Sequence, residues 1–126
     1  MGTKIDSFTD LEAWKTGHAL ILDIYAITKD FPREELFGLA NQIRRASVSI
    51  TSNIAEGFSR HSYKEKVQFY AIALGSLTEV QNQLLIGRDL KYISKERFNI
   101  LAEQTVHISK LLNGLIKKSK ALIPTS

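Results

Sequence analysis

The sequence predicts an all-α protein, an antiparallel bundle of four helices connected up-down-up-down. Apolar residues recur in alternating steps of three and four along four consecutive segments, which is the spacing of one face of a helix. Short breaks separate the segments, and the two prolines of the chain, Pro32 and Pro124, lie outside them. No run of alternating apolar and polar residues with turn signals indicates a strand. Consecutive helices with short links pack as antiparallel neighbours, which gives the bundle.

The first two segments are separated by the turn Asp30-Phe31-Pro32. The first helix is expected to be capped by Thr9 or Asp10, and its apolar row reads Leu11, Trp14, His18, Ile21, Tyr25 and Thr28. We interpret His18 in this row as a core histidine with a hydrogen-bond partner. The second helix carries the row Leu36, Leu39, Ile43, Ala46, Ile50, Asn53 and Gly57.

A break over residues 57–61 precedes the third helix, for which Ser62 and Glu65 form a capping box. Its row is Tyr70, Ala73, Leu77, Val80 and Leu84. Ser94 is expected to cap the fourth helix, whose row reads Phe98, Leu101, Thr105, Ile108, Leu112, Leu115, Ser119 and Leu122. We therefore predict one domain over residues 1–126, with an N-terminal arm at 1–8 and a C-terminal tail at 121–126.

The positive charge is concentrated in the fourth helix. The formal net charge is +4, yet residues 1–103 hold thirteen basic and thirteen acidic side chains. The excess consists of Lys110, Lys117, Lys118 and Lys120, which we predict, together with Arg60 at the turn after the second helix, to contact nucleic acid. Lysines near the C-terminus of a helix also complement its dipole and favour solubility, and this simpler interpretation stays open.

The second and third helices are unusually poor in charge. Only Glu79 is charged between Lys66 and Arg88, and a helix exposed to water normally keeps one charged face. We therefore predict that these helices are covered by other copies of the chain in a homo-oligomer; an uncharged polar surface is the alternative. Gly75 supports a tight contact, because glycine inside a helix costs up to about 1 kcal/mol relative to alanine.

A polar cluster is predicted on these two helices. Glu79 needs a cationic partner if it is buried, and Arg44 or Arg45 is the natural one because a guanidinium binds a carboxylate in a bidentate fork. The cluster, interpreted as a buried network or a subunit interface, comprises Arg44, Arg45, Asn53, Glu56, Ser76 and Glu79. In the alternative interpretation the arginines bind phosphate and the carboxylates are catalytic.

Nothing in the sequence favours an enzyme, a cofactor or a metal site. The three histidines are scattered, no Glu-x-x-His repeat occurs, and there is no glycine-rich phosphate loop beside the arginines. The chain has no cysteine, no apolar run behind a basic start, and polar residues throughout its low-charge segments. We expect a cytoplasmic protein that is not inserted in a membrane.

Three segments of the chain resemble a known family. They read FTDLEAWKTGHAL from residue 8, FPREELFGLANQIRRASVSITSNIAEGFSR from residue 31, and FYAIALGSLTEVQNQL from residue 69. The sequence is similar to the 23S rRNA intervening-sequence proteins, small bacterial four-helix bundles often described as ribosomal-protein-like. The resemblance covers nearly all of residues 8–120 and extends to the accessory variability determinant of diversity-generating retroelements.

This resemblance implies a homopentamer. For the retroelement relative it also implies a basic surface that binds nucleic acid and a reverse transcriptase as a partner. We therefore expect a non-enzymatic, pentameric bundle that binds structured RNA or a ribonucleoprotein. The alternative is an assembly or adaptor protein that binds a protein partner, such as a reverse transcriptase, without a nucleic-acid role.

Overall fold

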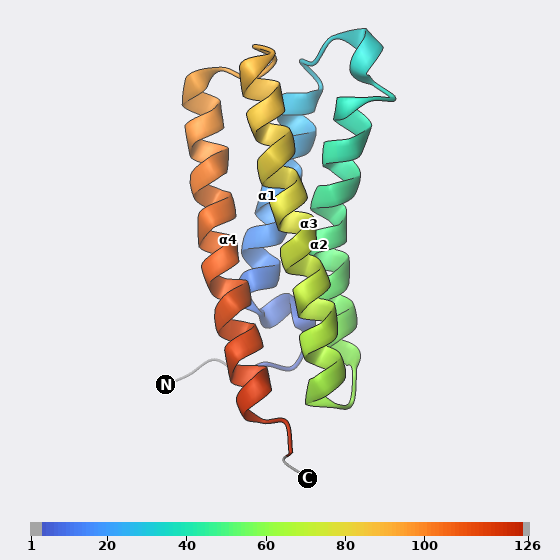
Figure 1. Ribbon diagram of the computed structural model, residues 1–126, viewed down its shortest axis with the longest axis vertical. Coiled ribbons are helices and arrows are strands. Elements are labelled where there is room, and N and C mark those ends of the chain that lie inside the picture. The colour runs from blue at the N-terminus through green and yellow to red at the C-terminus, as the bar shows by residue number, and fades with distance from the viewer. Residues whose placement is uncertain (1–3, 125–126) are drawn as a thin grey trace.

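A computed structural model, which describes residues 4–124, contains four long helices and, within that range, no strand. The helices are α1 (Glu12–Thr28), α2 (Leu39–Ser59), α3 (Tyr63–Asp89) and α4 (Lys95–Ala121). Two short 3₁₀ helices, η1 (Phe8–Asp10) and η2 (Arg33–Glu35), precede α1 and α2. Successive helices run in opposite directions, and each packs on its two neighbours around the bundle (Figure 1). The predicted up-down-up-down bundle is confirmed.

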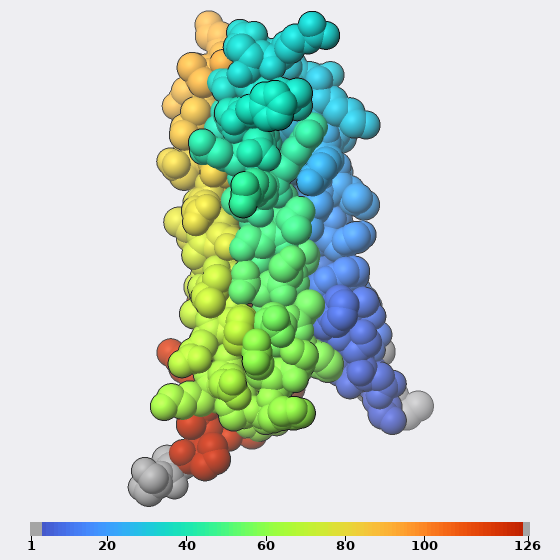
Figure 2. Space-filling model, turned by 90° about the vertical axis from the view of Figure 1, so that its right-hand side faces the viewer, coloured from blue at the N-terminus to red at the C-terminus, as the bar shows by residue number. Residues whose placement is uncertain are grey.

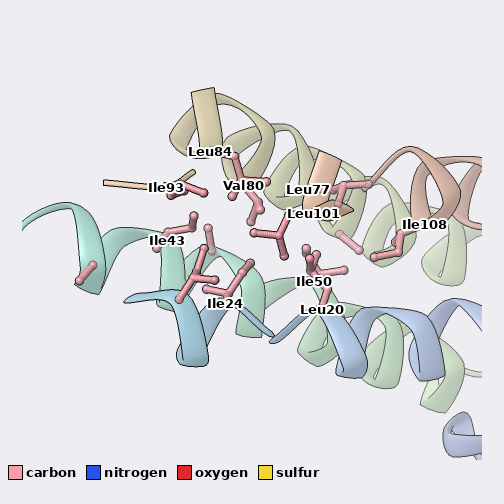
Figure 3. Packing of buried hydrophobic residues seen from close by; sticks show 14 of the residues in the cluster. Leu20, Ile24, Ile43, Ile50, Leu77, Val80, Leu84, Ile93, Leu101 and Ile108 are labelled. Atoms are coloured by element: carbon pink, nitrogen blue, oxygen red, sulfur yellow. The ribbon is translucent and has the colours of Figure 1, made fainter. Parts of the chain in front are cut away.

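The core is a continuous aliphatic cluster along the bundle axis (Figure 3). The row predicted for α3 is confirmed in full, since each of its five residues is buried. The rows predicted for α2 and α4 are confirmed in their central parts, whereas Leu36 and Leu122 at their ends are exposed. These rows were readable because their residues follow helical steps of three and four without interruption.

The row predicted for α1 is wrong by one position over most of its length, and Thr28 is its one buried member. Its buried residues are Ala13, Gly17, Leu20, Ile24, Ile27 and Thr28, whereas His18 and Tyr25 are exposed. Gly17 explains the difference, because a Cβ atom at this position would lie 3.0 Å from Cγ2 of Thr51 on α2. The small residues Ala13 and Gly17 let α1 approach its neighbours closely, and the larger aromatic side chains are displaced to the margin.

The helix starts agree with the prediction for two helices out of three. Oγ of Ser62 accepts a hydrogen bond from the backbone N–H of Glu65 at 3.1 Å, and Ser94 caps α4 in the same way through Arg97. The reciprocal half of the box at α3 is absent, since the Glu65 carboxylate accepts from the Ser62 hydroxyl instead. Neither Thr9 nor Asp10 caps α1; Ser7 caps η1, and α1 follows without a side-chain cap.

The bundle leaves both the start of α1 and the end of α4 at the same end as the α2–α3 turn (Figure 1). The opposite end carries the α1–α2 and α3–α4 links. None of the helices in residues 4–124 combines the length and the apolar character needed to cross a membrane.

Candidate nucleic-acid interface

The fold gathers the whole charge excess at one end of the bundle. The halves of the helices nearest the α2–α3 turn, residues 4–20, 50–76 and 108–124, contain nine Lys and Arg against five Asp and Glu. The other halves, residues 21–49 and 77–107, contain eight of each. We call the first set the basic end. Its potential is attractive to anions, while the opposite end has no net side-chain charge.

The four predicted lysines of α4 lie exposed at this end. Lys118 and Lys120 belong to the last turn of α4, and Lys117 lies beside them. None of the ion pairs formed within residues 4–124 involves Lys110, Lys117, Lys118 or Lys120. Their ammonium groups are therefore available to phosphate oxygens, and Lys118 and Lys120 in the last turn also face the negative end of the helix dipole, as the simpler interpretation expects.

Arg60 is less available than the sequence suggested. Its guanidinium lies 3.4 Å from the Glu56 carboxylate and 4.5 Å from the ring centre of Phe69. Its Nε is buried without an acceptor. The side chain is half-buried, so Arg60 fixes the junction of α2 and α3, and its charge is largely matched by Glu56.

Two further lysines at the α2–α3 turn belong to the basic end and were not identified from the sequence. Lys64 is exposed on the first turn of α3. Lys66 donates from Nζ to the backbone oxygen of Phe58 at 2.6 Å, which caps the last turn of α2. Partial burial lowers the pKa of Lys66 below its ordinary value. Antiparallel helix order alone places this turn near the end of α4, and that was the signal available in the sequence.

Of the predicted polar cluster, only Asn53 and Ser76 are joined between α2 and α3, and Ser49 links them. Oγ of Ser49 and Oγ of Ser76 lie 2.8 Å apart, and Nδ2 of Asn53 donates to the backbone oxygen of Ser49 at 2.8 Å. Nδ2 of Asn53 also lies 3.1 Å from Oγ of Ser49. The amide of Asn53 is thus satisfied at the helix boundary, which removes the desolvation cost of placing it there.

Arg44 does not join this network. Its Nε donates to Oγ1 of Thr28 at 2.7 Å, and its guanidinium lies 4.8 Å from the ring centre of Tyr25. Arg44 therefore binds α2 to α1, on the side of α2 opposite to Ser49, and the expectation that it could pair with Glu79 is wrong. Consecutive residues on a helix point about 100° apart, so Arg44 and Arg45 face different neighbours.

Arg45 lies exposed on the α2 side of the groove between α2 and α3, and Glu79 lies exposed on the α3 side. The groove is lined by Asn41, Gln42, Arg45, Ala46, Ser49, Ser76, Glu79 and Gln83. None of the ion pairs within residues 4–124 involves Arg45 or Glu79. The predicted buried ion pair is thus absent from the isolated chain, and both charges face outward.

An aromatic cluster at the start of α1 was also missed. The rings of Trp14 and His18 stack at 4.8 Å between centres, and Phe8 meets Trp14 edge-on at 5.6 Å. His18 therefore lies on the surface against an aromatic ring, and the expectation of a core histidine is wrong. Residues 4–124 contain no group of three or more histidine, aspartate or glutamate side chains arranged to hold a metal ion.

The fold and charge pattern define a small helical bundle with one basic end. The family model described as 23S rRNA-intervening sequence protein matches residues 9–114. The chain belongs to this family.

The same fold occurs among solved structures, five chains of which match this one. One is a protein of unknown function from the S23 ribosomal protein family of Bacteroides thetaiotaomicron. It is 24% identical, and the match covers 83% of this chain and 98% of that chain with a TM-score of 0.77. At this identity the likeness concerns the fold. No curated protein matches the sequence.

Proposed function

We propose that this chain is a non-enzymatic bundle that assembles into a homo-oligomer, a pentamer as the family resemblance implies, and binds structured RNA or a ribonucleoprotein in the cytoplasm. The observation that carries the RNA part is the placement of the whole net charge of +4 at one end of the bundle. The family name, which refers to 23S rRNA, supports the same class of partner.

The side chains at the basic end suit contacts to phosphate. Exposed lysines are flexible point charges that bind phosphate oxygens without a fixed geometry. A-form RNA offers proteins its backbone and shallow minor groove, and recognition of a folded RNA relies largely on its shape. One copy supplies few such contacts, but several copies in one assembly act together through their high effective concentration.

A salt titration with matched variants tests the RNA role. In the variant Lys117→Gln/Lys118→Gln/Lys120→Gln the basic end loses three charges. In the control Lys29→Gln/Lys91→Gln/Lys95→Gln the opposite end also loses three positive charges. We expect the first variant to bind a folded rRNA fragment at least about tenfold more weakly at low salt, with a shallower dependence on salt, and the control to bind like the parent.

Two results would contradict the RNA role. One is undetectable binding of the assembled parent protein at low salt. The other is equal weakening by the two triple variants, because that would mean net charge matters and the position of the charge does not.

A second candidate function is that of an adaptor for a protein partner, such as a reverse transcriptase. It is favoured by apolar side chains on the outer surface of α1 and α4, where Leu22 and Ile100 are each 59% exposed. For this function we expect the variant Leu22→Gln/Ile100→Gln to lose binding to a purified partner protein such as a reverse transcriptase, while its helical content stays that of the parent by circular dichroism.

A further inference from the structure

Besides their core faces, α2 and α3 each carry a second row of residues that alternates steps of four and three. The row on α2 is Asn41, Arg45, Val48, Ser52, Ala55 and Ser59, and the row on α3 is Gln68, Ile72, Gly75, Glu79, Asn82 and Ile86. We call these the outer rows. Both lie on the surface, with Ile72 51% exposed. Figure 2 shows the face of the bundle on which α2 lies between α1 and α3.

This spacing is that of helices packed against other helices in coiled coils. Water-facing helices normally carry charge on such a row, as α1 and α4 do. Each outer row instead contains a single charge, and the two charges are opposite: Arg45 on α2 and Glu79 on α3. The outer row of α2 is thus complementary to the outer row of α3.

Three polar groups at this face lack partners within residues 4–124. Arg45 and Glu79 form no ion pair, as described above. Oε1 of Gln83, a side chain only 8% exposed that lines the groove between the rows, accepts no hydrogen bond. A buried acceptor without a donor is costly in a finished structure, which indicates that a donor comes from outside the chain.

Gly75 has no explanation within the chain either. A Cβ atom at this position would meet nothing within 4 Å. Glycine in the middle of a helix is nevertheless unfavourable relative to alanine, and a close approach by another backbone is a common reason for keeping it. The missing contact lies on the outer row of α3, four residues before Glu79.

From these observations we infer that a second copy of this chain covers this face. The outer row of α3 in one copy packs on the outer row of α2 in the next, and Glu79 of one copy pairs with Arg45 of the other. The interface is heterologous, so each subunit uses both rows and the arrangement can close into a ring. The inference rests on the proposed homo-oligomer and identifies its interface.

Charge reversal with trans-complementation tests this pairing. Arg45→Glu places two carboxylates at the subunit boundary, and Glu79→Arg places two guanidinium groups there. We expect each variant to assemble at least about a hundredfold more weakly in sedimentation experiments. The double variant Arg45→Glu/Glu79→Arg restores assembly, and mixing the two single variants gives complexes that contain both, because the charges are complementary wherever unlike subunits meet.

Mixing separates pairing between copies from pairing within one chain. If Arg45 and Glu79 paired only within the chain, the double variant would recover but the mixture of single variants would not. Complexes are detected by capturing one tagged variant and measuring the untagged one. Circular dichroism confirms that each variant retains its helices.

Gly75→Gln provides a second test, with Gly114→Gln as its matched control. A Cβ atom added at Gly114 on α4 would also meet nothing within 4 Å, so both changes favour the helix equally. We expect Gly75→Gln to weaken assembly at least about tenfold and Gly114→Gln to leave it unchanged.

The possible failures are distinguishable. A parent protein that sediments as a monomer at micromolar concentration overturns both the homo-oligomer and this interface. A parent that assembles and is insensitive to Arg45→Glu, Glu79→Arg and Gly75→Gln overturns the interface alone.

Discussion

The two helix pairs of the bundle have similar cores and different surfaces. Where α1 meets α4, charged groups bridge the boundary: Asp23 accepts from Gln104 at 2.8 Å, and Arg97 lies 3.6 Å from Asp30. Where α2 meets α3, uncharged side chains bridge the boundary, and Oγ of Ser49 lies 2.8 Å from Oγ of Ser76. The boundary of the first pair is bridged by charged groups, whereas the second pair, with an uncharged boundary and charge-poor outer rows, presents a surface suited to another helix.

This difference separates two kinds of apolar residue on α2 and α3. Those that face the core stabilise the folded chain. Those of the outer rows contribute little to its stability until another molecule covers them. Substitutions matched in chemistry but placed on the two rows should therefore have different effects on folding and on assembly.

The largest difference is expected between Ile50→Ala and Ile72→Ala. Ile50 is fully buried, so its truncation leaves a cavity and should lower the free energy of unfolding by roughly 2–4 kcal/mol. Ile72 is 51% exposed, and its truncation should change that free energy by about 0.5 kcal/mol or less. Urea unfolding at a protein concentration at which sedimentation shows monomers measures both. Similar losses for the two variants would mean that Ile72 already belongs to the core.

Glycine substitutions give the next contrast. A Cβ atom at Gly57 would lie 2.7 Å from Cε1 of Tyr70, so Gly57→Ala should destabilise the monomer by about 1–3 kcal/mol. Gly75→Ala meets no such obstacle and should stabilise the monomer by up to about 1 kcal/mol through helix propensity. Thermal unfolding followed by circular dichroism gives the sign of each effect. Destabilisation by Gly75→Ala would contradict the open space found around this residue.

The adjacent arginines of α2 allow a smaller comparison. Arg44→Ala removes the hydrogen bond to Thr28 and the contact with Tyr25, and should cost about 1–2 kcal/mol. Arg45→Ala should change monomer stability by about 0.5 kcal/mol or less and should weaken assembly instead. Denaturant unfolding and sedimentation on the same two variants separate these outcomes. An equal effect of both on unfolding would show that Arg45 is also engaged within the chain.

The number and order of the helices and the starts of α3 and α4 could be predicted because these depend on local patterns. The α3 row was correct throughout because Tyr70, Ala73, Leu77, Val80 and Leu84 follow each other in unbroken steps of three and four. The α1 row was wrong because large aromatic side chains at Trp14, His18 and Tyr25 suggested a core. The actual core position, Gly17, has no side chain and is recognisable only when the distance to α2 is known.

For the candidate site, charge counting located the lysines of α4 but not the full basic end. Lys64 and Lys66 join it because the α2–α3 turn and the end of α4 lie at the same end of the bundle, which the predicted helix order implied but charge counting alone did not use. Pairing preferences also gave the wrong partner for Arg44, because a rotation of about 100° between neighbours decides which helix each side chain meets. Local sequence predicts which residue types are present, and tertiary geometry decides their partners.

The smallest effect concerns the start of α1, where ionisation matters and the outer rows are not involved. Oδ2 of Asp10 accepts hydrogen bonds from the backbone N–H groups of Asp6 and Ser7, each at 3.0 Å, and these bonds lower the pKa of Asp10 below its ordinary value of 3.8. Because the folded state holds the carboxylate ionised, its stabilising contribution is present above pH 3.8 and is lost as the pH falls through the folded pKa. Asp10→Asn should therefore be slightly less stable than the parent at pH 6 and indistinguishable from it in strong acid, as measured by thermal unfolding. The control Asp6→Asn keeps the backbone donor and the Asp10 carboxylate, and should retain the pH dependence of the parent. Since Asp10 precedes α1 and lies outside both outer rows, assembly at pH 6 should be unchanged in Asp10→Asn, and a loss of assembly there would contradict the confinement of the interface to α2 and α3.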